Sequence, residues 1–238
     1  MKLDILAFGA HPDDVELGCS GTIAKEVSLG KKVGIIDLTR GELGTRGSKE
    51  IRDQEAMAAA TILGVQVRQN LNFRDGFFIN DEQHQLEIIK TIRKYQPEIV
   101  LCNAIDDRHI DHGKGSKLVS DACFLSGLTK IETELDGKKQ EAWRPKLVYH
   151  YIQWKNLEPD FVVDITGFID QKMQSVMAYG SQFFDPNSNE PETPITSKNF
   201  LDSIKYRAQD LGRLVNVEFA EGFTVERYLT VNSLSDLK

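Results

Sequence analysis

The sequence predicts an α/β fold: a Rossmann-like, doubly wound and mostly parallel sheet with helices on both faces, and a C-terminal part that shapes a pocket. Short apolar runs alternate with helical patterns along residues 3–126, and such alternation is typical of parallel sheets built from βαβ units. Right-handed crossovers favour a chain that builds outward from its first strand and then returns to place the fourth strand on the other side of the first. Strands one and four would then flank the point at which the strand order reverses.

Signals at the ends of the segments define four strand–helix pairs in the first half of the chain. Ser48 is suited to cap a helix that Gly64 follows, and either Asn80 or Asp81 can cap the next helix, which Pro97 stops. The expected strands are residues 3–9, 32–39, 65–72 and 98–104, and the expected helices are residues 19–30, 48–63, 81–95 and 113–126.

The second half of the sequence is less regular. A Pro- and Asn-rich exposed loop at 185–194 is too short to link two domains, and the chain shows no internal repeat. We therefore expect a single domain over residues 1–238, with a Rossmann-like core at 1–127 and a C-terminal part at 128–238 that completes the pocket. The expected elements of this part are strands at 146–154 and 161–166 and helices at 167–179 and 197–214.

The composition is that of an ordinary globular protein and argues against several classes of partner. The chain has 238 residues, of which 40% are hydrophobic and 27% charged, so it can bury a sizeable core. Its net charge of -7 argues against nucleic acid or an anionic membrane as a partner, because binding a polyanion needs a field of the opposite sign. The N-terminus is unlike a signal peptide, no apolar run is long enough to span a membrane, and we expect a cytoplasmic protein. Its three cysteines, Cys19, Cys102 and Cys123, are expected to be free buried thiols.

Two clusters of polar residues follow the first and fourth expected strands. The first is FGAHPDDVELG at residues 8–18, and the second is IDDRHIDHG at residues 105–113. Ligands of doubly wound sheets bind at the carboxyl ends of the strands, where the strand order reverses, so these two loops should meet in space. From these stretches we take three of the five histidines and three of the carboxylates as candidate site residues: His11, Asp13, Asp14, His109, Asp111 and His112.

This set of side chains suits a divalent metal ion. Two imidazoles and one carboxylate supply three protein ligands and leave a position for water, which is the arrangement expected of catalytic zinc. The adjacent Asp13 and Asp14 point in different directions, so one can bind the metal while the other faces the bound water. Pro12 restricts the residue before it and stiffens the loop. His84 and His150 fall outside both clusters and are expected at the surface or in packing.

Two other functional classes remain open. Two histidines and a carboxylate also form the facial triad of non-haem iron oxygenases, although such enzymes do not require a second aspartate over the water. The other class is a noncatalytic sugar- or nucleotide-binding module on a Rossmann-like sheet. The stretch FGAHPDD at residues 8–14 lacks the Gly-x-Gly-x-x-Gly turn of pyrophosphate sites, which counts against the nucleotide form.

The two motifs AHPDDVE and DRHIDH resemble those of the LmbE and PIG-L family of zinc-dependent N-deacetylases, which act on substrates that carry N-acetylglucosamine. The further stretches DLTRGELGTRG, EIRDQEA and AEGF are similar to the bacterial branch that deacetylates N-acetylglucosaminyl malate in bacillithiol biosynthesis. The resemblance implies hydrolysis with Zn2+ or Fe2+, and other N-acetylglucosamine substrates such as chitooligosaccharides stay open. By motif position, it places the metal on His11, Asp14 and His112, makes Asp13 the general base, and makes His109 the partner of the developing charge, held by Asp111.

The resemblance also suggests how a substrate could be held. Arg52 matches a family arginine that contacts the sugar, and Arg46, Arg52 or Arg108 could grip the carboxylates of malate through forked hydrogen bonds. Arg46 and Arg108 could equally pair with acidic residues of their own loops, namely Glu42, Asp106 or Asp107.

The sequence leaves open whether three aromatic residues line the pocket. Tyr149 and Tyr151 fall on one side of an expected strand, where core packing is the default expectation. Phe200 occupies the place at which some relatives carry a tyrosine that donates to the oxyanion. The family resemblance further implies a homo-oligomer, often a hexamer, with a small amino-sugar conjugate as substrate.

Overall fold

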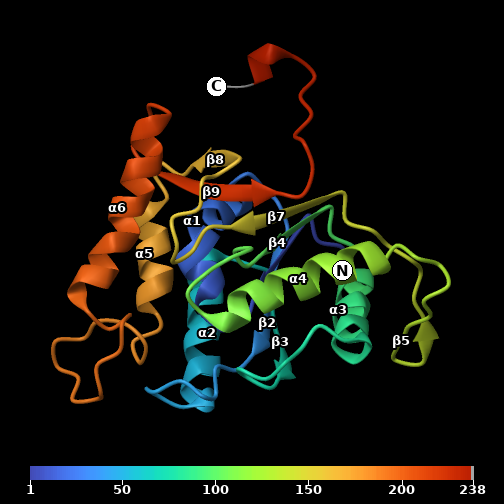
Figure 1. Ribbon diagram of the computed structural model, residues 1–238, viewed down its shortest axis with the longest axis horizontal. Coiled ribbons are helices and arrows are strands. Elements are labelled where there is room, and N and C mark those ends of the chain that lie inside the picture. The colour runs from blue at the N-terminus through green and yellow to red at the C-terminus, as the bar shows by residue number, and fades with distance from the viewer. Residues whose placement is uncertain (237–238) are drawn as a thin grey trace.

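The centre of the molecule is a seven-stranded sheet in the order β3-β2-β1-β4-β7-β9-β8 (Figure 1). The computed structural model describes residues 1–236. Strands β1 to β4 and β7 run parallel, whereas β9 is antiparallel to both β7 and β8. The strands are β1 Ile5–Gly9, β2 Val33–Thr39, β3 Val67–Phe73, β4 Ile99–Cys102, β7 Leu147–Tyr151, β8 Phe161–Asp164 and β9 Ala220–Val225, and a separate hairpin pairs β5 Glu134–Leu135 with β6 Lys138–Lys139.

The strand order confirms the doubly wound topology. Strand β1 pairs with β2 on one side and with β4 on the other, so Ala7 lies between Ile35 and Leu101. Strands β2 and β3 therefore extend the sheet on one side of β1, and β4 is added on its other side, as the crossover rule predicts. The loops that follow these two strands begin at the same edge of the sheet.

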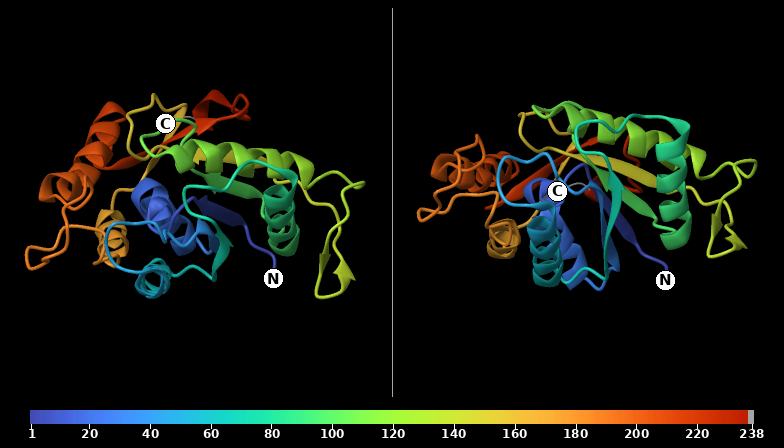
Figure 2. Two further views of the ribbon diagram at one scale, coloured as in Figure 1. Left: turned by 60° about the horizontal axis from the view of Figure 1, so that its bottom comes forward. Right: turned by 90° about the horizontal axis from the view of Figure 1, so that it is seen from below.

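Helices cover both faces of the sheet (Figure 2). Leu6 and Phe8 of β1 point into a core that α3 and α4 cover, and Ile5 and Ala7 point into a second core that α1 and α2 cover. This division follows from the alternation of side chains along a strand. The helices are α1 Asp14–Ser28, α2 Lys49–Leu63, α3 Glu82–Tyr95, α4 Ile110–Leu125, α5 Ile169–Met177, α6 Lys198–Leu214 and the short 3-10 helix η1 Leu234–Asp236.

Two helices begin earlier than the sequence patterns indicate. Helix α1 begins at Asp14 instead of residue 19, and α4 begins at Ile110 instead of residue 113. Carboxylates in a first turn are favoured by the helix dipole, so the acidic motif residues extend these helices toward the strands. Asp14, Asp111 and His112 therefore lie on the first turns of helices and not in loops.

Strand β9 is absent from the sequence-based assignment. Its sequence, AEGFTV, contains Glu221 and Gly222, which are poor strand formers. Its pairing between β7 and β8 provides the tertiary context that overrides this local preference. Helices α5 and α6 stand at this end of the sheet (Figure 1). Glu221 of β9 forms an ion pair with Lys172 of α5.

Other expectations of the sequence are also settled by the fold. Ser48 caps α2 by accepting a hydrogen bond from the backbone N–H of Ile51, and Asp81 caps α3. All three cysteines are buried free thiols. Within residues 1–236, none of the helices combines the length and the hydrophobicity that a membrane span requires.

Candidate active site

A cavity of about 440 Å3 lies where the loops after β1 and β4 meet. His11, Asp13 and Asp14 line it from the loop after β1 and the start of α1, and His109 and His112 line it from the start of α4. The structure thus brings together two clusters that lie about 100 residues apart in the sequence. Residues of the C-terminal part complete the wall, among them Gln153, Trp154, Lys172, Phe200, Arg207 and Glu221.

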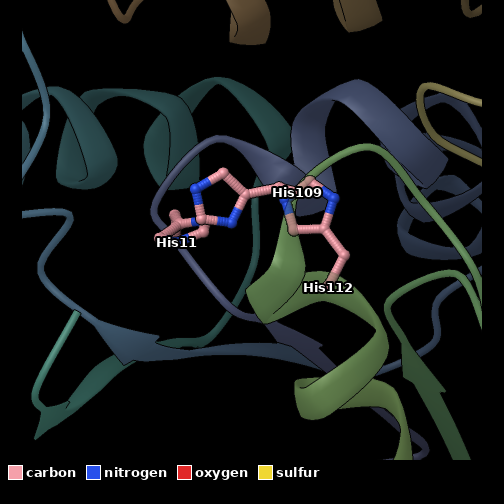
Figure 3. A group of neighbouring side chains, drawn as sticks. All are labelled: His11, His109 and His112. Atoms are coloured by element: carbon pink, nitrogen blue, oxygen red, sulfur yellow. The ribbon is translucent and has the colours of Figure 1, made fainter. Parts of the chain in front are cut away.

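Asp14 lies between two buried histidine side chains. Its Oδ2 is 3.5 Å from Nδ1 of His11, and its Oδ1 is 3.1 Å from Nε2 of His112. Figure 3 shows His109 and His112 at the start of α4 with their rings close to that of His11. The three residues that the sequence predicts as metal ligands therefore face one another across a small space.

The outward nitrogens of the same two histidines are held by further carboxylates. Nε2 of His11 lies 3.1 Å from Oδ1 of Asp75, and Nδ1 of His112 lies 2.6 Å from Oδ2 of Asp107. Carboxylates in this position fix the orientation of a metal-binding imidazole and make it a better ligand. Each histidine thus has one nitrogen toward Asp14 and the other on a carboxylate, which is a donor set that fits zinc or iron.

Sequence reasoning missed both of these carboxylates. Asp107 stands five positions before His112, inside the second motif, and could have been found there. Asp75 follows β3, at the same edge of the sheet as the two motifs, and this place in the topology is its only signal. Two other groups of side chains in the described residues could also hold a metal ion: His11 with Asp75 and Asp111, and His11 with His109 and His112. The ligand atoms of each group lie within 4.8 Å of one another.

The electrostatics of the cluster favour a cation. Burial by itself lowers the pKa of His112, but Asp14 and Asp107 outweigh it and raise the pKa to about 9. Burial opposes ionisation of Asp14, yet His112 and His11 hold the pKa of this carboxyl well below its ordinary value. A metal ion that enters the site must therefore displace protons from the imidazoles.

Asp13 combines a strained backbone with a shifted pKa. Its φ of 111° lies in the left-handed region, which is costly for a residue other than glycine and is characteristic of functional sites. Burial raises the pKa of Asp13 to about 7, Arg52 opposes this rise, and Asp14 adds to it. A carboxyl group with a pKa near neutrality can both accept and return a proton at physiological pH.

The contacts of His109 and Asp111 correct the expectation that the Asp111 carboxylate holds His109. Nδ1 of His109 accepts a hydrogen bond from the backbone N–H of Asp111 at 3.2 Å, because His109 is the N-cap of α4. The carboxylate of Asp111 lies instead 3.4 Å from Nε2 of His11, accepts a hydrogen bond from the backbone N–H of Gly76 and pairs with Lys114.

The protonation of His109 follows from these surroundings. Burial lowers the pKa of His109, and the neighbouring His11 and His112 lower it further. A neutral ring whose Nδ1 accepts a hydrogen bond carries its proton on Nε2. His109 can therefore donate one hydrogen bond into the cavity without being charged.

Comparison with known proteins identifies the family. Residues 6–123 match the family described as PIG-L, GlcNAc-PI de-N-acetylase. The solved structure of the conserved protein TT1542 from Thermus thermophilus has 35% sequence identity and a TM-score of 0.86, over 97% of this chain and 98% of that one. The chain belongs to the PIG-L family.

Two relatives are named for different reactions. Diacetylchitobiose deacetylase from Thermococcus kodakarensis is 29% identical over 75% of this chain and 70% of that protein. The 4-oxalmesaconate hydratase from Pseudomonas putida is 27% identical over 74% of this chain and 73% of that protein. Similarity alone therefore does not decide which reaction this PIG-L family member performs.

The three predicted arginines of this PIG-L family member have different surroundings. Arg52 is buried and donates to Oδ2 of Asp13 at 2.9 Å. Arg46 lines the cavity and pairs with Glu190 of the 185–194 loop. The guanidinium of Arg108, also in the cavity wall, lies 4.6 Å from the centre of the Trp154 ring.

Of the three aromatic residues, Phe200 lines the cavity. Its ring stacks on Trp154 at a centroid distance of 5.2 Å. Tyr151 is fully buried and donates to the carbonyl of Phe8, and Tyr149 packs against the ring of Phe161. Both tyrosines therefore pack in the hydrophobic core, as their positions on the strand predict.

Two further histidines lie outside the cavity. His84 packs edge-on against the ring of Phe73, and its Nδ1 is hydrogen-bonded to Oδ1 of Asp81. His150 is buried and is hydrogen-bonded to Ser116 and Glu226.

Proposed function

We propose that this protein is a metal-dependent N-deacetylase of an N-acetylglucosamine conjugate, with N-acetylglucosaminyl malate as its substrate. The observation that carries the proposal is the arrangement around Asp14, whose two oxygens face His11 and His112 while Asp13 stands beside them in the cavity. The matched family description supports the reaction class.

His11, Asp14 and His112 would hold the metal ion. When bound there, zinc or iron would lower the pKa of a coordinated water to about 7 in favourable sites and polarise the carbonyl of the substrate. Asp75 and Asp107 keep the two imidazoles oriented through their outward nitrogens.

Asp13 performs the proton transfers. It removes a proton from the water as the water oxygen attacks the acetamide carbon, and this attack forms the tetrahedral intermediate. The same proton is then given to the nitrogen of the substrate, because an amine leaves only when it is protonated. The carbon–nitrogen bond breaks, and acetate and a free glucosamine amine are released.

His109 stabilises the charge that develops on the former carbonyl oxygen. With Nδ1 occupied by the backbone N–H of Asp111, its Nε2–H is the donor available to the cavity. Loss of one such donor typically lowers kcat by about 100- to 1,000-fold.

The cationic side chains of the cavity wall are suited to bind a substrate whose aglycone is anionic. The guanidinium of Arg108 is spread over Trp154, a position in which its outer N–H groups can hold a carboxylate. Arg207 also lines the cavity and is held in place by a hydrogen bond to the carbonyl of Trp154. Two cationic groups on this side of the cavity match the two carboxylates of malate better than a neutral chitooligosaccharide.

The experiment is an amine-release assay on N-acetylglucosaminyl malate with zinc-loaded and iron-loaded protein. We expect Asp13→Asn to retain its metal and to lose about 100- to 10,000-fold in kcat. Diacetylchitobiose and 4-oxalmesaconate are the comparison substrates, because relatives are named for these compounds. Hydration of 4-oxalmesaconate without any release of acetate from the two sugars would contradict the proposal. Size-exclusion chromatography of the same samples tests the proposed homo-oligomer.

A further inference from the structure

Helix α1 is interrupted just behind the turn that carries Asp14. The backbone at Cys19 has φ -147° and ψ 19°, so Asp14–Ser28 consists of a short first segment and a longer second one. An interruption leaves carbonyl groups of the first segment and N–H groups of the second without their helical partners. Cys19 and its neighbours are buried, so water cannot satisfy these groups.

Lys172 of α5 donates to two carbonyl groups at the break, one of which, that of Glu16, also accepts from the Ser20 hydroxyl at 2.7 Å. Its Nζ donates to the carbonyl oxygens of Glu16 at 3.1 Å and Leu17 at 2.8 Å, and to Oε1 of Glu221 at 2.7 Å. The side chain is 3% exposed. An ammonium group has three N–H donors, and these three acceptors use all of them.

Glu221 of β9 satisfies the amide groups on the other side of the break. Its Oε1 accepts from the backbone N–H of Gly21 at 3.0 Å, and its Oε2 accepts from that of Thr22 at 2.7 Å. Its carboxylate thus caps the second segment in the way that an acidic residue caps a helix N-terminus. Glu221 is 4% exposed and lines the cavity together with Lys172.

The pair joins the C-terminal part of the chain to the turn that bears the proposed metal ligand. A helix whose hydrogen-bond ladder is broken at Cys19 does not transmit the rigidity of its second segment to its first turn. The position of the first turn then depends on the groups that bridge the break, in addition to the hydrogen bonds that Asn103, Gln153 and the backbone N–H of His11 donate to Asp14. A fully bonded buried ion pair contributes little net stability over apolar residues, but it fixes one arrangement of the groups that it contacts.

We propose that Lys172 and Glu221 are positioning residues that fix the first turn of α1, and with it Asp13 and Asp14, for metal binding and proton transfer. This inference rests on the proposed function for the role of Asp13 and Asp14. The bridging of the break by the two side chains is independent of it.

The test compares Lys172→Met with Arg93→Met as a matched control. Arg93 of α3 is another buried cation that donates to backbone carbonyl oxygens, those of Ser126, Leu128 and Ile131, and it lies outside the cavity wall. Loss of either cation removes hydrogen bonds from buried carbonyl groups, so both variants should lose global stability. Only Lys172→Met should change the site.

We expect Lys172→Met to bind zinc about 10- to 100-fold more weakly, as removal of a group that orients metal ligands typically does. Amide hydrogen exchange measured by mass spectrometry should become faster in the peptide that spans residues 14–22. Arg93→Met should keep the wild-type zinc affinity and the wild-type exchange of that peptide. Glu221→Gln keeps one acceptor for the two amide groups and should give the same changes in smaller degree.

Unchanged zinc affinity and unchanged exchange of residues 14–22 in Lys172→Met would overturn the inference, as would equal changes in Arg93→Met. If Lys172→Met does not fold, the same outcomes are read from Glu221→Gln. Both measurements need no substrate, so a failure of the deacetylase assay in the wild-type protein is distinguishable from a failure of this inference.

Discussion

Replacing Arg52 by methionine should shift the pH dependence of the reaction, because Arg52 is the cation that holds the pKa of Asp13 down. Burial raises this pKa to about 7 in spite of the Arg52 guanidinium, whose nitrogen lies 2.9 Å from Oδ2 of Asp13. Methionine keeps an unbranched apolar stem and removes the charge. An arginine beside a carboxylate typically lowers its pKa by about 1 to 3 units. The pKa of Asp13 should therefore rise to a value between about 8 and 10 in the variant.

The sign of the effect follows from the role of Asp13 as a base. Only the ionised carboxylate can take a proton from water, so kcat/KM rises as pH passes upward through the pKa of the free enzyme. At pH 7, about half of the wild-type Asp13 is ionised. In Arg52→Met the ionised fraction would fall by about 5- to 500-fold, and the rate should recover as the pH is raised.

The assay is amine release measured across a range of pH on both sides of neutrality, with kcat and KM determined separately. Arg52→Lys keeps a positive charge and is the control. The acidic limb of its plot of kcat/KM against pH should therefore stay near that of the wild type. A loss of substrate contact alone would raise KM at every pH without moving the limb. If the limb of Arg52→Met coincides with that of the wild type, Asp13 is not the group that titrates.

Three further predictions concern the metal site and the core. Asp107→Asn should weaken zinc binding by about 10- to 100-fold in equilibrium dialysis, since Asp107 holds Nδ1 of His112; equal affinity would contradict the role given to it. Zinc affinity should also increase as the pH rises toward 9, because the pKa of His112 is raised to about 9 and the imidazole must lose its proton to bind metal; a flat dependence measured by competition with a chelator would contradict this competition between zinc and the proton of His112. Gly18→Ala should lower the free energy of unfolding in urea by about 1 to 3 kcal/mol, because the added Cβ would collide with the buried ring of Tyr151; unchanged stability would show that the ring can move aside.

The first half of the fold could be predicted from the sequence because its information is local. The alternation of buried strands and helices from residue 3 to residue 126, with caps such as Ser48 and Asp81, specifies a parallel doubly wound sheet. That topology places the carboxyl ends of β1 and β4 side by side, so the two motifs had to meet. The composition of the motifs by itself then indicates a metal site.

The sequence could not specify which atoms meet inside the site. Asp75 reaches His11 across 64 positions, and the carboxylate of Asp111 turns to His11 while its amide holds His109. These choices depend on distances of a few ångströms between helices and loops, which no local pattern encodes. Asp107 lies within the motif, but only the folded chain distinguishes it from its exposed neighbour Asp106: Asp107 is buried, holds His112 and accepts from the backbone N–H groups of Trp154 and Lys155.

In the C-terminal part, tertiary contacts determined the secondary structure and the side-chain partners to a greater degree than in the first half. Strand β9 exists because β7 and β8 present free hydrogen-bonding edges to it, although Glu221 and Gly222 locally disfavour a strand. The ion pair of Lys172 with Glu221 and its contacts with the break in α1 join three elements that are distant in sequence. Local sequence thus determined the elements and the chemistry of the motifs, because periodicity and capping act over a few residues. Long-range packing determined the partners of each charged group, because a buried charge is stabilised only by the groups that the completed fold brings to it.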